Sequence, residues 1–316
     1  MDNLTHSLIG ALLGQAGLKR KTGLAMPALI IGANIPDVDA TCTIYGIESL
    51  AMRRGLTHGP IAWVVLPLIL AGLLWWYDRW QAKRGKRPEK RLAVHFGWLW
   101  ALSFIACLTH PAMDWLNTYG IRLLEPFSHR WFYGDALFIV DVWLWLGMGF
   151  ATWFSLRREK RGRPWRWPAA AALAGAGIYI LVNGAISVGS GLLFGINNKA
   201  PGKYISADTV ITSPVPFIPW RRELIVGRRN DWYVGSSDEF EGYKPPRPIA
   251  PHICTWPDTD ELTRSRPDLK AFLFWSRAPF VTPSEDGKGI VFNDARFYNG
   301  FTRGRFAVEV RGVPCK

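Results

Sequence analysis

Long apolar segments separated by short basic loops are the feature that most limits the folds open to this chain. Four segments are long enough to cross a bilayer, which needs about 20 apolar residues; they cover residues 59–77, 92–109, 136–156 and 168–196. Two more, residues 4–18 and 22–35, are shorter, and their length does not decide whether they span the membrane. We therefore predict a mainly α-helical, polytopic transmembrane bundle with four long spans and two short N-terminal helices.

The positive charge of the chain lies mainly between these apolar segments. The formal net charge is +13, and much of the excess falls in residues 19–21, 79–91 and 157–166. Basic loops of this kind are typical of the cytoplasmic side of a membrane protein, which argues against a nucleic-acid partner. With all three loops inside, residues 36–58, 110–137 and those after about 197 face outward. In a bacterium the outward side is the periplasmic face, so we predict a multi-pass membrane protein with these regions facing the periplasm.

The last third of the chain differs in composition from the rest. Short runs such as residues 223–226 and 289–292 alternate in polarity between turn-forming residues, a pattern typical of β-strands. We predict a transmembrane helical domain over residues 1–196 that carries a metal site, and a periplasmic β-rich soluble domain over residues 197–316. Whether Cys254 and Cys315 form a disulfide stays open, although an oxidising compartment would permit it.

Histidine and aspartate repeatedly interrupt the apolar segments. Ionisable groups at membrane depth are costly and usually functional, and both residue types bind zinc and similar divalent ions. The topology, deduced from loop charges alone, places eight of them near the outer face: His6, Asp37, Asp39, His58, His110, Asp114, Asp135 and Asp141. Their convergence predicts one metal site at that face of the membrane.

Spacing gives some of these residues more weight than others. His110 and Asp114 are four residues apart and share a face on a continuous helix, although Pro111 disfavours helix at that point. Asp141 lies inside an apolar run, so a purely structural role would be expensive. Asp135 precedes the same run and could simply cap a helix.

The segment from residue 36 to residue 58 offers a base and an anion-binding group. Asp37 and Asp39 alternate after a proline, so one can bind metal while the other orients a ligand, although an ordinary turn is the structural alternative. Arg53 and Arg54 precede His58, and arginine suits a phosphate or carboxylate group of a substrate. The alternative for these arginines is a loop pairing with Glu48.

Taken together, the motifs resemble one known family. They are Met1-Asp-Asn-Leu-Thr-His6, Asn34-Ile-Pro-Asp-Val-Asp39, Arg54-Gly-Leu-Thr-His58, Thr109-His-Pro-Ala-Met-Asp114 and Phe138-Ile-Val-Asp141. In order and spacing the chain resembles the membrane-bound metal-dependent hydrolases, also described as YdjM-type LexA-regulated inner-membrane hydrolases. The resemblance implies a metal-dependent hydrolase without naming a substrate. A more distant similarity to the zinc-dependent phospholipase C and P1-nuclease group suggests a phosphoester.

One position departs from the family pattern. The family commonly reads His-Arg-Gly-x-Thr-His-Ser, whereas this chain has Arg53 in place of the first histidine. If that histidine binds a second metal in relatives, this protein holds a single ion or uses the arginine to bind an anion. The resemblance therefore leaves the number of ions open.

These observations predict a membrane-embedded hydrolase that acts at the periplasmic face on a small or lipid-linked anionic substrate, with membrane lipid as its partner. One or two divalent ions, zinc before Mn or Mg, are expected on His6, Asp39, His58, His110, Asp114 and Asp141. Bound metal lowers the pKa of its water from about 15.7 to about 7. We assign Asp37 as general base and Arg53 or Arg54 to an anionic group of the substrate.

Two other classes of protein stay open at this point. A transporter would need polar residues through the membrane, whereas here they gather at one face. A non-catalytic membrane protein would use the metal structurally and bind a partner through its outer domain; a structural zinc site is closed, while a catalytic one keeps an open position. The oligomeric state is not decided by the sequence.

Overall fold

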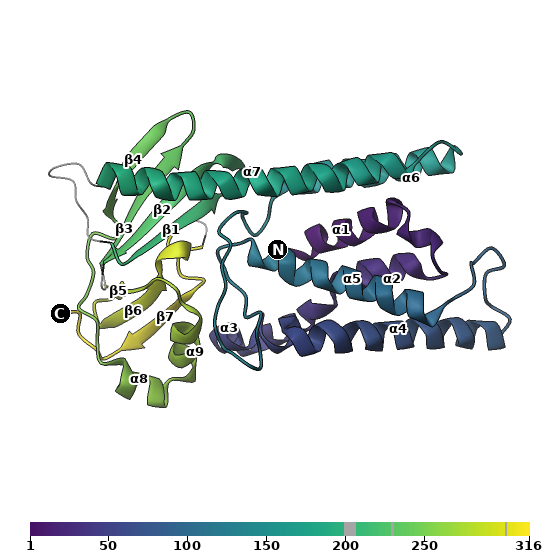
Figure 1. Cartoon of the computed structure of the whole chain (residues 1–316). Helices are drawn as coiled ribbons and strands as arrows, with labels where there is room; N and C mark the ends of the chain where they lie inside the picture. The colour runs from purple at the N-terminus through teal and green to yellow at the C-terminus, as the bar shows by residue number, and fades with distance from the viewer. Residues whose placement is uncertain (199–206, 229–230, 301) are drawn as a thin grey trace. The chain divides into compact units, whose positions relative to one another are not determined.

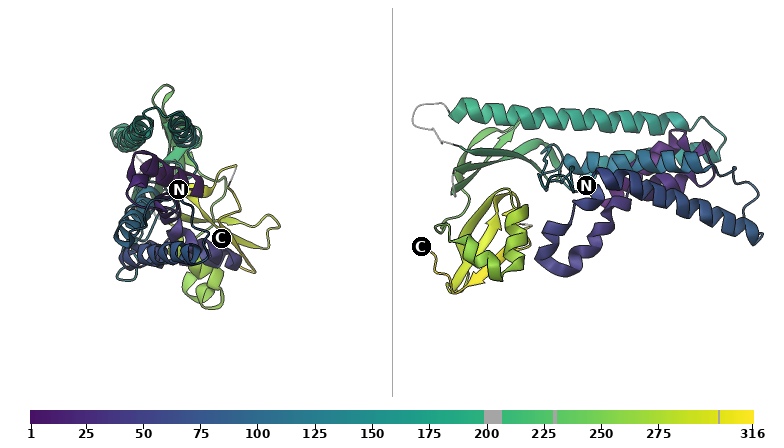
Figure 2. Two further views of the ribbon diagram at one scale, coloured as in Figure 1. Left: turned by 90° about the vertical axis from the view of Figure 1, so that its right-hand side faces the viewer. Right: turned by 60° about the horizontal axis from the view of Figure 1, so that its bottom comes forward.

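The computed structural model describes residues 1–198, 207–228, 231–300 and 302–316, which form two compact units (Figures 1 and 2). The first unit comprises Met1–Asp39 and Arg54–Gly184, and the second comprises Ala40–Arg53 and Ala185–Lys316. The expected boundary at residues 196/197 differs from this division, which falls inside one long helix. The last turns of that helix belong to the second unit because they pack against its sheet.

Helices build the first unit. They are α1 (Asn3–Gln15), α2 (Ala25–Gly32), α4 (Pro60–Lys83), α5 (Phe96–Trp115), α6 (Val142–Lys160) and the first part of α7 (Arg166–Asn198), with short 3-10 turns at η1 (Leu18–Arg20), η2 (Ile35–Glu48, which runs on into the second unit) and η3 (Leu56–His58). Helix α1 begins where it does because the Asp2 carboxylate accepts hydrogen bonds from the backbone of Leu4 and Thr5. Pro60 at the start of α4 supplies a preformed first turn.

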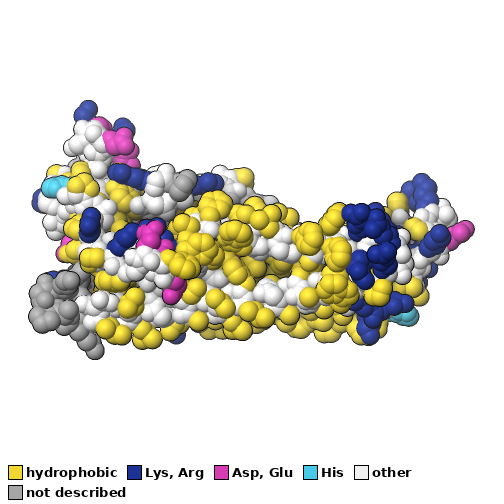
Figure 3. Space-filling model, turned by 90° about the horizontal axis from the view of Figure 1, so that it is seen from above, with side chains coloured by type: hydrophobic (Ala, Val, Ile, Leu, Met, Phe, Trp, Pro, Cys, Tyr) yellow, Lys and Arg dark blue, Asp and Glu magenta, His cyan; other side chains and the backbone are white. Residues whose placement is uncertain are grey.

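Three helices in the described part of the chain are long and apolar enough to cross a membrane: α4, α5 and α7. The expectation of four long spans is therefore not confirmed. The predicted segment 136–156 becomes α6, which begins only at Val142 and ends in the charged residues 157–160. Side chains such as Ile178 and Leu181 of α7 are exposed, as on a lipid-facing helix. Figure 3 shows extended apolar surface, with Lys and Arg side chains gathered beyond it.

Small residues allow α1, α2 and α5 to approach closely. A Cβ at Gly10 of α1 would lie 2.5 Å from the Leu29 carbonyl oxygen of α2, and one at Gly32 would lie 3.0 Å from the Ser103 carbonyl oxygen of α5. Buried apolar side chains of α2, α4 and α5, including Leu29, form a shared core. This packing fixes the helices that carry the polar residues discussed below.

Two antiparallel sheets form most of the second unit. The first contains β1 (Thr209–Val215), β2 (Ile218–Arg228), β3 (Asp231–Asp238) and β4 (Gly242–Pro248) in sequential order, and the second contains β5 (Pro279–Pro283), β6 (Gly289–Asp294) and β7 (Ala307–Arg311). Helices α3 (Ser49–Met52), α8 (Thr259–Ser265) and α9 (Pro267–Trp275) and the turn η4 (Ala295–Phe297) complete the unit. The β-rich character predicted for the C-terminal part is confirmed.

The core of the second unit joins its two sheets. Ile225 and Trp232 of the first sheet pack with Phe280 of the second. On the other face of the first sheet, Phe194 of α7 packs with Leu224 and Val226. Cys254 and Cys315 form a disulfide, which settles a pairing that the sequence left open.

Candidate metal centre

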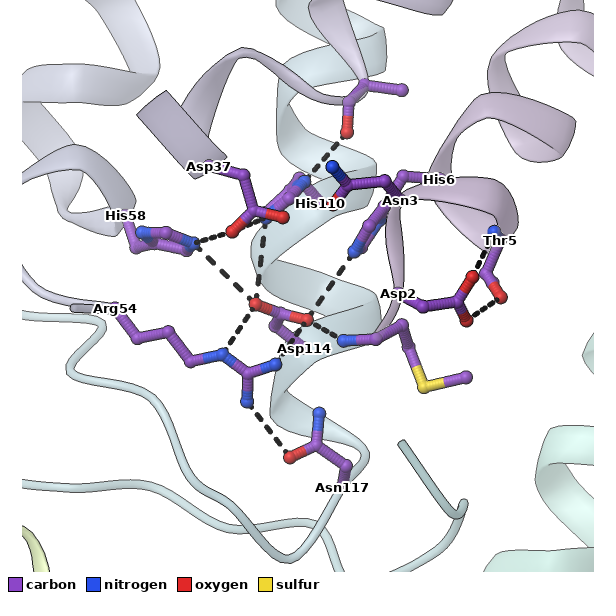
Figure 4. A network of polar contacts seen from close by, with 12 residues as sticks. Asp2, Asn3, Thr5, His6, Asp37, Arg54, His58, His110, Asp114 and Asn117 are labelled. Carbon is purple, nitrogen blue, oxygen red and sulfur yellow. Dashed lines mark hydrogen bonds and ion pairs between the residues drawn. The ribbon is translucent and has the colours of Figure 1, made fainter. Parts of the chain in front are cut away.

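Four helical elements of the first unit bring five of the predicted residues together. His6 comes from α1, Asp37 from η2, His58 from η3, and His110 and Asp114 from α5 (Figure 4). Helix α5 continues through Pro111, so the shared face predicted for its two residues exists. All three histidines and Asp114 are fully buried.

The tightest group consists of Asp37, His58, His110 and Asp114, whose ligand atoms all lie within 4.8 Å of one another. Both histidine Nε2 atoms lie 3.6 Å from Asp114 Oδ2. Asp37 Oδ1 lies 3.6 Å from His110 Nε2 and 3.9 Å from His58 Nε2. Ligands on a tetrahedral zinc with bonds of about 2.0–2.1 Å would be about 3.4 Å apart. The group therefore has to contract from these separations to hold an ion.

Hydrogen bonds fix which nitrogen of each ring faces the group. His110 Nδ1 lies 2.7 Å from the Ala33 carbonyl oxygen, which can only accept, so this nitrogen carries the proton. His58 Nδ1 lies 2.9 Å from Thr57 Oγ1 and 3.3 Å from Asp39 Oδ2. The Nε2 atoms of both rings are buried and have no hydrogen-bond partner in the described part of the chain. A histidine that binds a divalent ion typically has one ring nitrogen held by a hydrogen bond and the other facing the ion, which is the arrangement of these two rings.

The two neighbouring aspartates contact different partners. Asp37, expected as the general base, belongs to the inner group. Asp39, expected as a ligand, instead orients His58, and its Oδ2 also accepts hydrogen bonds of 2.8 Å from the Arg54 backbone N–H and from Thr57 Oγ1. The 3-10 geometry of η2, rather than an extended loop, sets this arrangement.

Burial affects the charge of these groups differently. It lowers the pKa of His58 to about 4, with a partial opposing effect from Asp39, so this ring is neutral near pH 7. Burial alone would raise the pKa of Asp39, but hydrogen bonding and attraction to His58 outweigh it and lower that pKa. Burial likewise opposes ionisation of Asp37, while His110 and His58 lower its pKa further than burial raises it. At neutral pH His58 is therefore a neutral imidazole and Asp37 and Asp39 are carboxylates, the forms that bind metal.

His6 lies beside the inner group rather than within it. Its ring stacks on that of His110 with the centroids 3.8 Å apart, and its Nε2 lies 3.5 Å from Asp114 Oδ1. Neither of its ring nitrogens has a hydrogen-bond partner among the residues that the structure describes. A buried imidazole with both nitrogens unsatisfied is costly, so His6 is available as a further ligand.

Arg54 is directed at Asp114. Its Nε lies 3.1 Å from Asp114 Oδ2, and one terminal nitrogen donates to Oδ1 at 3.2 Å. The other terminal nitrogen donates to Asn117 Oδ1 at 3.0 Å, and the guanidinium lies over the Tyr119 ring. This buried fork holds the Asp114 carboxylate, so contact of Arg54 with substrate stays a prediction. Arg53 belongs to the second unit, so its contact with substrate also stays a prediction.

The structure places Asp141 and Asp135 outside the group. Helix α6 begins after Asp141, whose carboxylate caps it by accepting a 3.0 Å bond from the Leu144 backbone and another from Tyr179 Oη. Asp141 therefore caps α6 and does not lie within a helix, contrary to our prediction. Because Asp141 is the N-cap, the prediction that Asp135 caps this helix is wrong as well. Asp135 has a left-handed backbone, with φ of 49°, some residues before α6 begins.

Sequence reasoning missed the residues that support the group. Thr57 was visible only as part of a motif and Asn117 had no assigned role, yet they hold His58 and Arg54. The Ala33 carbonyl carries no sequence signal because every residue has a backbone carbonyl, and the Met1 amino group, which contacts Asp114, is likewise not a side chain that a motif could show.

The helices and the buried cluster define a membrane protein with a candidate metal centre. Residues 1–188, more than half of the chain, match the family described as "YdjM inner membrane protein". The chain belongs to this family. It is 25% identical over 317 residues to a protein of Bacillus subtilis (strain 168) described as "Uncharacterized protein YfhP". The aligned region covers 94% of this chain and 87% of that protein. No solved structure matches the chain.

Proposed function

We propose that this protein is a metal-dependent hydrolase of a phosphoester, with a lipid-linked phosphate as the preferred class of substrate. The observation that supports this most is the buried group of two imidazoles and two carboxylates, in which the histidine Nε2 atoms have no hydrogen-bond partner among the described residues. A divalent ion there would act as a Lewis acid and acidify a coordinated water.

We assign three residues of the group as metal ligands and the fourth as a general base. His58, His110 and Asp114 form a two-histidine, one-carboxylate set, as in catalytic zinc sites that keep one position open. Asp37 lies 3.6–3.9 Å from both Nε2 atoms, close enough to accept a proton from a water in that position. Asp39 and Ala33 hold the rings, and Arg54 holds Asp114.

The surroundings of the site support a substrate at a membrane surface. Two of the ligands lie on α5, a candidate membrane span, near its C-terminal end. The disulfide of the second unit suits an oxidising compartment, so we place that unit and the site on the periplasmic side of a multi-pass inner-membrane protein.

Hydrolysis assays on the purified full-length protein test this proposal. With zinc or manganese present, wild type should hydrolyse a member of a panel of lipid and soluble phosphoesters. Asp37→Asn should retain metal but lose about 10²–10⁴-fold in turnover, the usual contribution of a general base. His252→Ala, an exposed histidine of the second unit, is the matched control and should keep full activity.

A structural metal site is the second candidate, and one observation favours it. Four protein ligands already complete a tetrahedral shell, which is typical of structural zinc. In that case Asp37→Asn should lose the metal itself, and no phosphoester should be turned over. The same variant therefore separates the two functions.

A further inference from the structure

The first sheet of the second unit has exposed aromatic side chains at one end. In a sequential antiparallel sheet, the β1–β2 and β3–β4 turns lie at the same end, which we call the hairpin end. Phe217 and Phe240 occupy these turns and are 65% and 82% exposed. Trp220 contacts Phe240 edge to face, with the ring centroids 5.7 Å apart. Exposed aromatic side chains gathered at one end of a sheet are unfavourable in water unless another surface covers them.

Contacts with α7 show which way the hairpin end points. Arg222 Nε donates to Ser187 Oγ at 2.7 Å, while Leu224 and Val226, further along β2, pack with Phe194. Strand β2 thus runs in the same direction as α7. The hairpin end therefore lies on the Ser187 side of these contacts, away from the C-terminal end of the helix.

The length of α7 locates these turns with respect to a bilayer. Its 33 residues extend about 50 Å at 1.5 Å per residue, whereas a hydrocarbon core is about 30 Å thick and takes about 20 residues. The helix starts beside the basic loop at residues 157–166, which fits a headgroup region. Counting about 20 residues from Arg166 brings the opposite membrane surface near Ser187, where the hairpin end begins.

A charged cavity of about 440 Å³ opens on the same sheet, beside this end. Its polar lining is Arg221, Glu223, Ser236, Lys244 and Arg247. The cross-strand pairs Glu223–Ser236 and Ser236–Lys244 place these groups on one face. Arg221, Lys244 and Arg247 share this lining with Glu223, and Lys244 is already paired with Glu241 at 2.7 Å, so the two arginines leave an excess positive charge that favours an anion. Burial raises the pKa of the Glu223 carboxyl, with a partial opposing effect from Arg221.

We propose that the hairpin end is a binding site for the headgroup of an anionic membrane phospholipid, separate from the metal centre. Arg221 and Arg247 bind the phosphate, since guanidinium groups bind phosphate through paired hydrogen bonds. Glu223 and Ser236 accept hydrogen bonds from headgroup hydroxyls such as those of glycerol. Phe217, Trp220 and Phe240 lie in the interfacial region, where amphipathic and aromatic rings are favoured.

Native mass spectrometry of the full-length protein in detergent tests the headgroup site, with phosphatidylglycerol and phosphatidylcholine as probes. Phosphatidylglycerol should bind wild type more tightly than phosphatidylcholine. The variant Arg221→Gln/Arg247→Gln should weaken that binding about tenfold, as expected for loss of charge-assisted hydrogen bonds. The control Arg228→Gln/Lys270→Gln removes the same charge outside the cavity and should leave binding within about twofold, since exposed charges contribute little.

Two results would overturn the proposal. One is equal phosphatidylglycerol binding by the cavity variant and its control. The other is inorganic phosphate or glycerol 3-phosphate competing as well as the lipid, which would indicate a site for soluble anions. Metal content should be the same in both variants and wild type, so failure here does not bear on the proposed hydrolase.

Spin labels in nanodiscs test the aromatic part even if the cavity variant folds poorly. Labels at Phe217→Cys and Phe240→Cys, in a Cys42→Ser/Cys107→Ser background, should be accessible to oxygen and protected from a soluble nickel chelate. A label at Asp231→Cys, at the opposite end of the same sheet, is the control and should be open to the chelate. Equal chelate access at all three positions would show that the hairpin end lies in water.

Discussion

Single residues around the metal centre have distinct roles because each has different partners. His58 and His110 present Nε2 to the group because Asp39 and Ala33 occupy the opposite nitrogens. Asp37 and Asp39, two residues apart, differ for the same reason: only Asp37 faces the inner group. A ligand can thus be distinguished from a supporting residue only when both sides of the ring are seen.

Removing the charge of Asp39 tests this division of roles. Asp39→Asn should weaken zinc affinity about 10–100-fold, the usual effect of losing a carboxylate that orients a ligating histidine. Competition with a zinc chelator measures this, with Asp286→Asn, an exposed aspartate of the second unit, as control. Complete loss of metal would make Asp39 a ligand, and unchanged affinity would remove it from the site.

Pairs of elements depend on a few contacts that sequence patterns do not reveal. Gly10 lets α1 approach α2, because a Cβ there would lie 2.5 Å from the Leu29 carbonyl oxygen. Gly10→Ala should cost about 1–3 kcal/mol, the usual penalty of overpacking, and should displace His6. Gly177→Ala on α7, where a Cβ meets nothing within 4 Å, is the matched control. Thermal unfolding in detergent measures the stability of both variants. Equal midpoints would show that α1 and α2 do not pack closely at Gly10.

The turn after β6 makes the second unit sensitive to acid. Asp294 is buried, and burial alone would raise its pKa, but Arg296 and several hydrogen bonds outweigh this and lower it. A lowered folded pKa gives stability that is present above the unfolded pKa of about 3.9 and lost as pH falls through the folded value. Unfolding of the second unit, followed by tryptophan fluorescence, should therefore become easier below about pH 4.

Asp294→Asn removes this titrating group. The variant should be less stable than wild type at pH 7, where a buried Arg296 has lost its charged partner. Its stability should also change less than that of wild type between pH 5 and about pH 3. If wild type and Asp294→Asn lose the same stability as the pH falls, groups other than Asp294 cause the acid sensitivity.

At the scale of the whole molecule, the sequence was a better guide to which residues lie close together than to the role of each residue. Apolar runs and loop charges were enough to predict a helical part with a His and Asp cluster and a β-rich C-terminal part. The start of α6 was not predictable, since it depends on Asp141 acting as a cap. Nor was the division inside α7, since hydropathy does not show that Phe194 packs on a sheet.

Elemental analysis of the purified full-length protein, together with X-ray absorption at the zinc edge, tests the central claim most directly. Wild type should bind at least one zinc ion per chain through imidazole nitrogen and carboxylate oxygen, without sulfur. His110→Ala and Asp114→Ala should lose that ion, while His252→Ala keeps it. Unchanged metal content in His110→Ala and Asp114→Ala, or a sulfur ligand in wild type, would contradict the assignment of the buried His and Asp group as a metal centre.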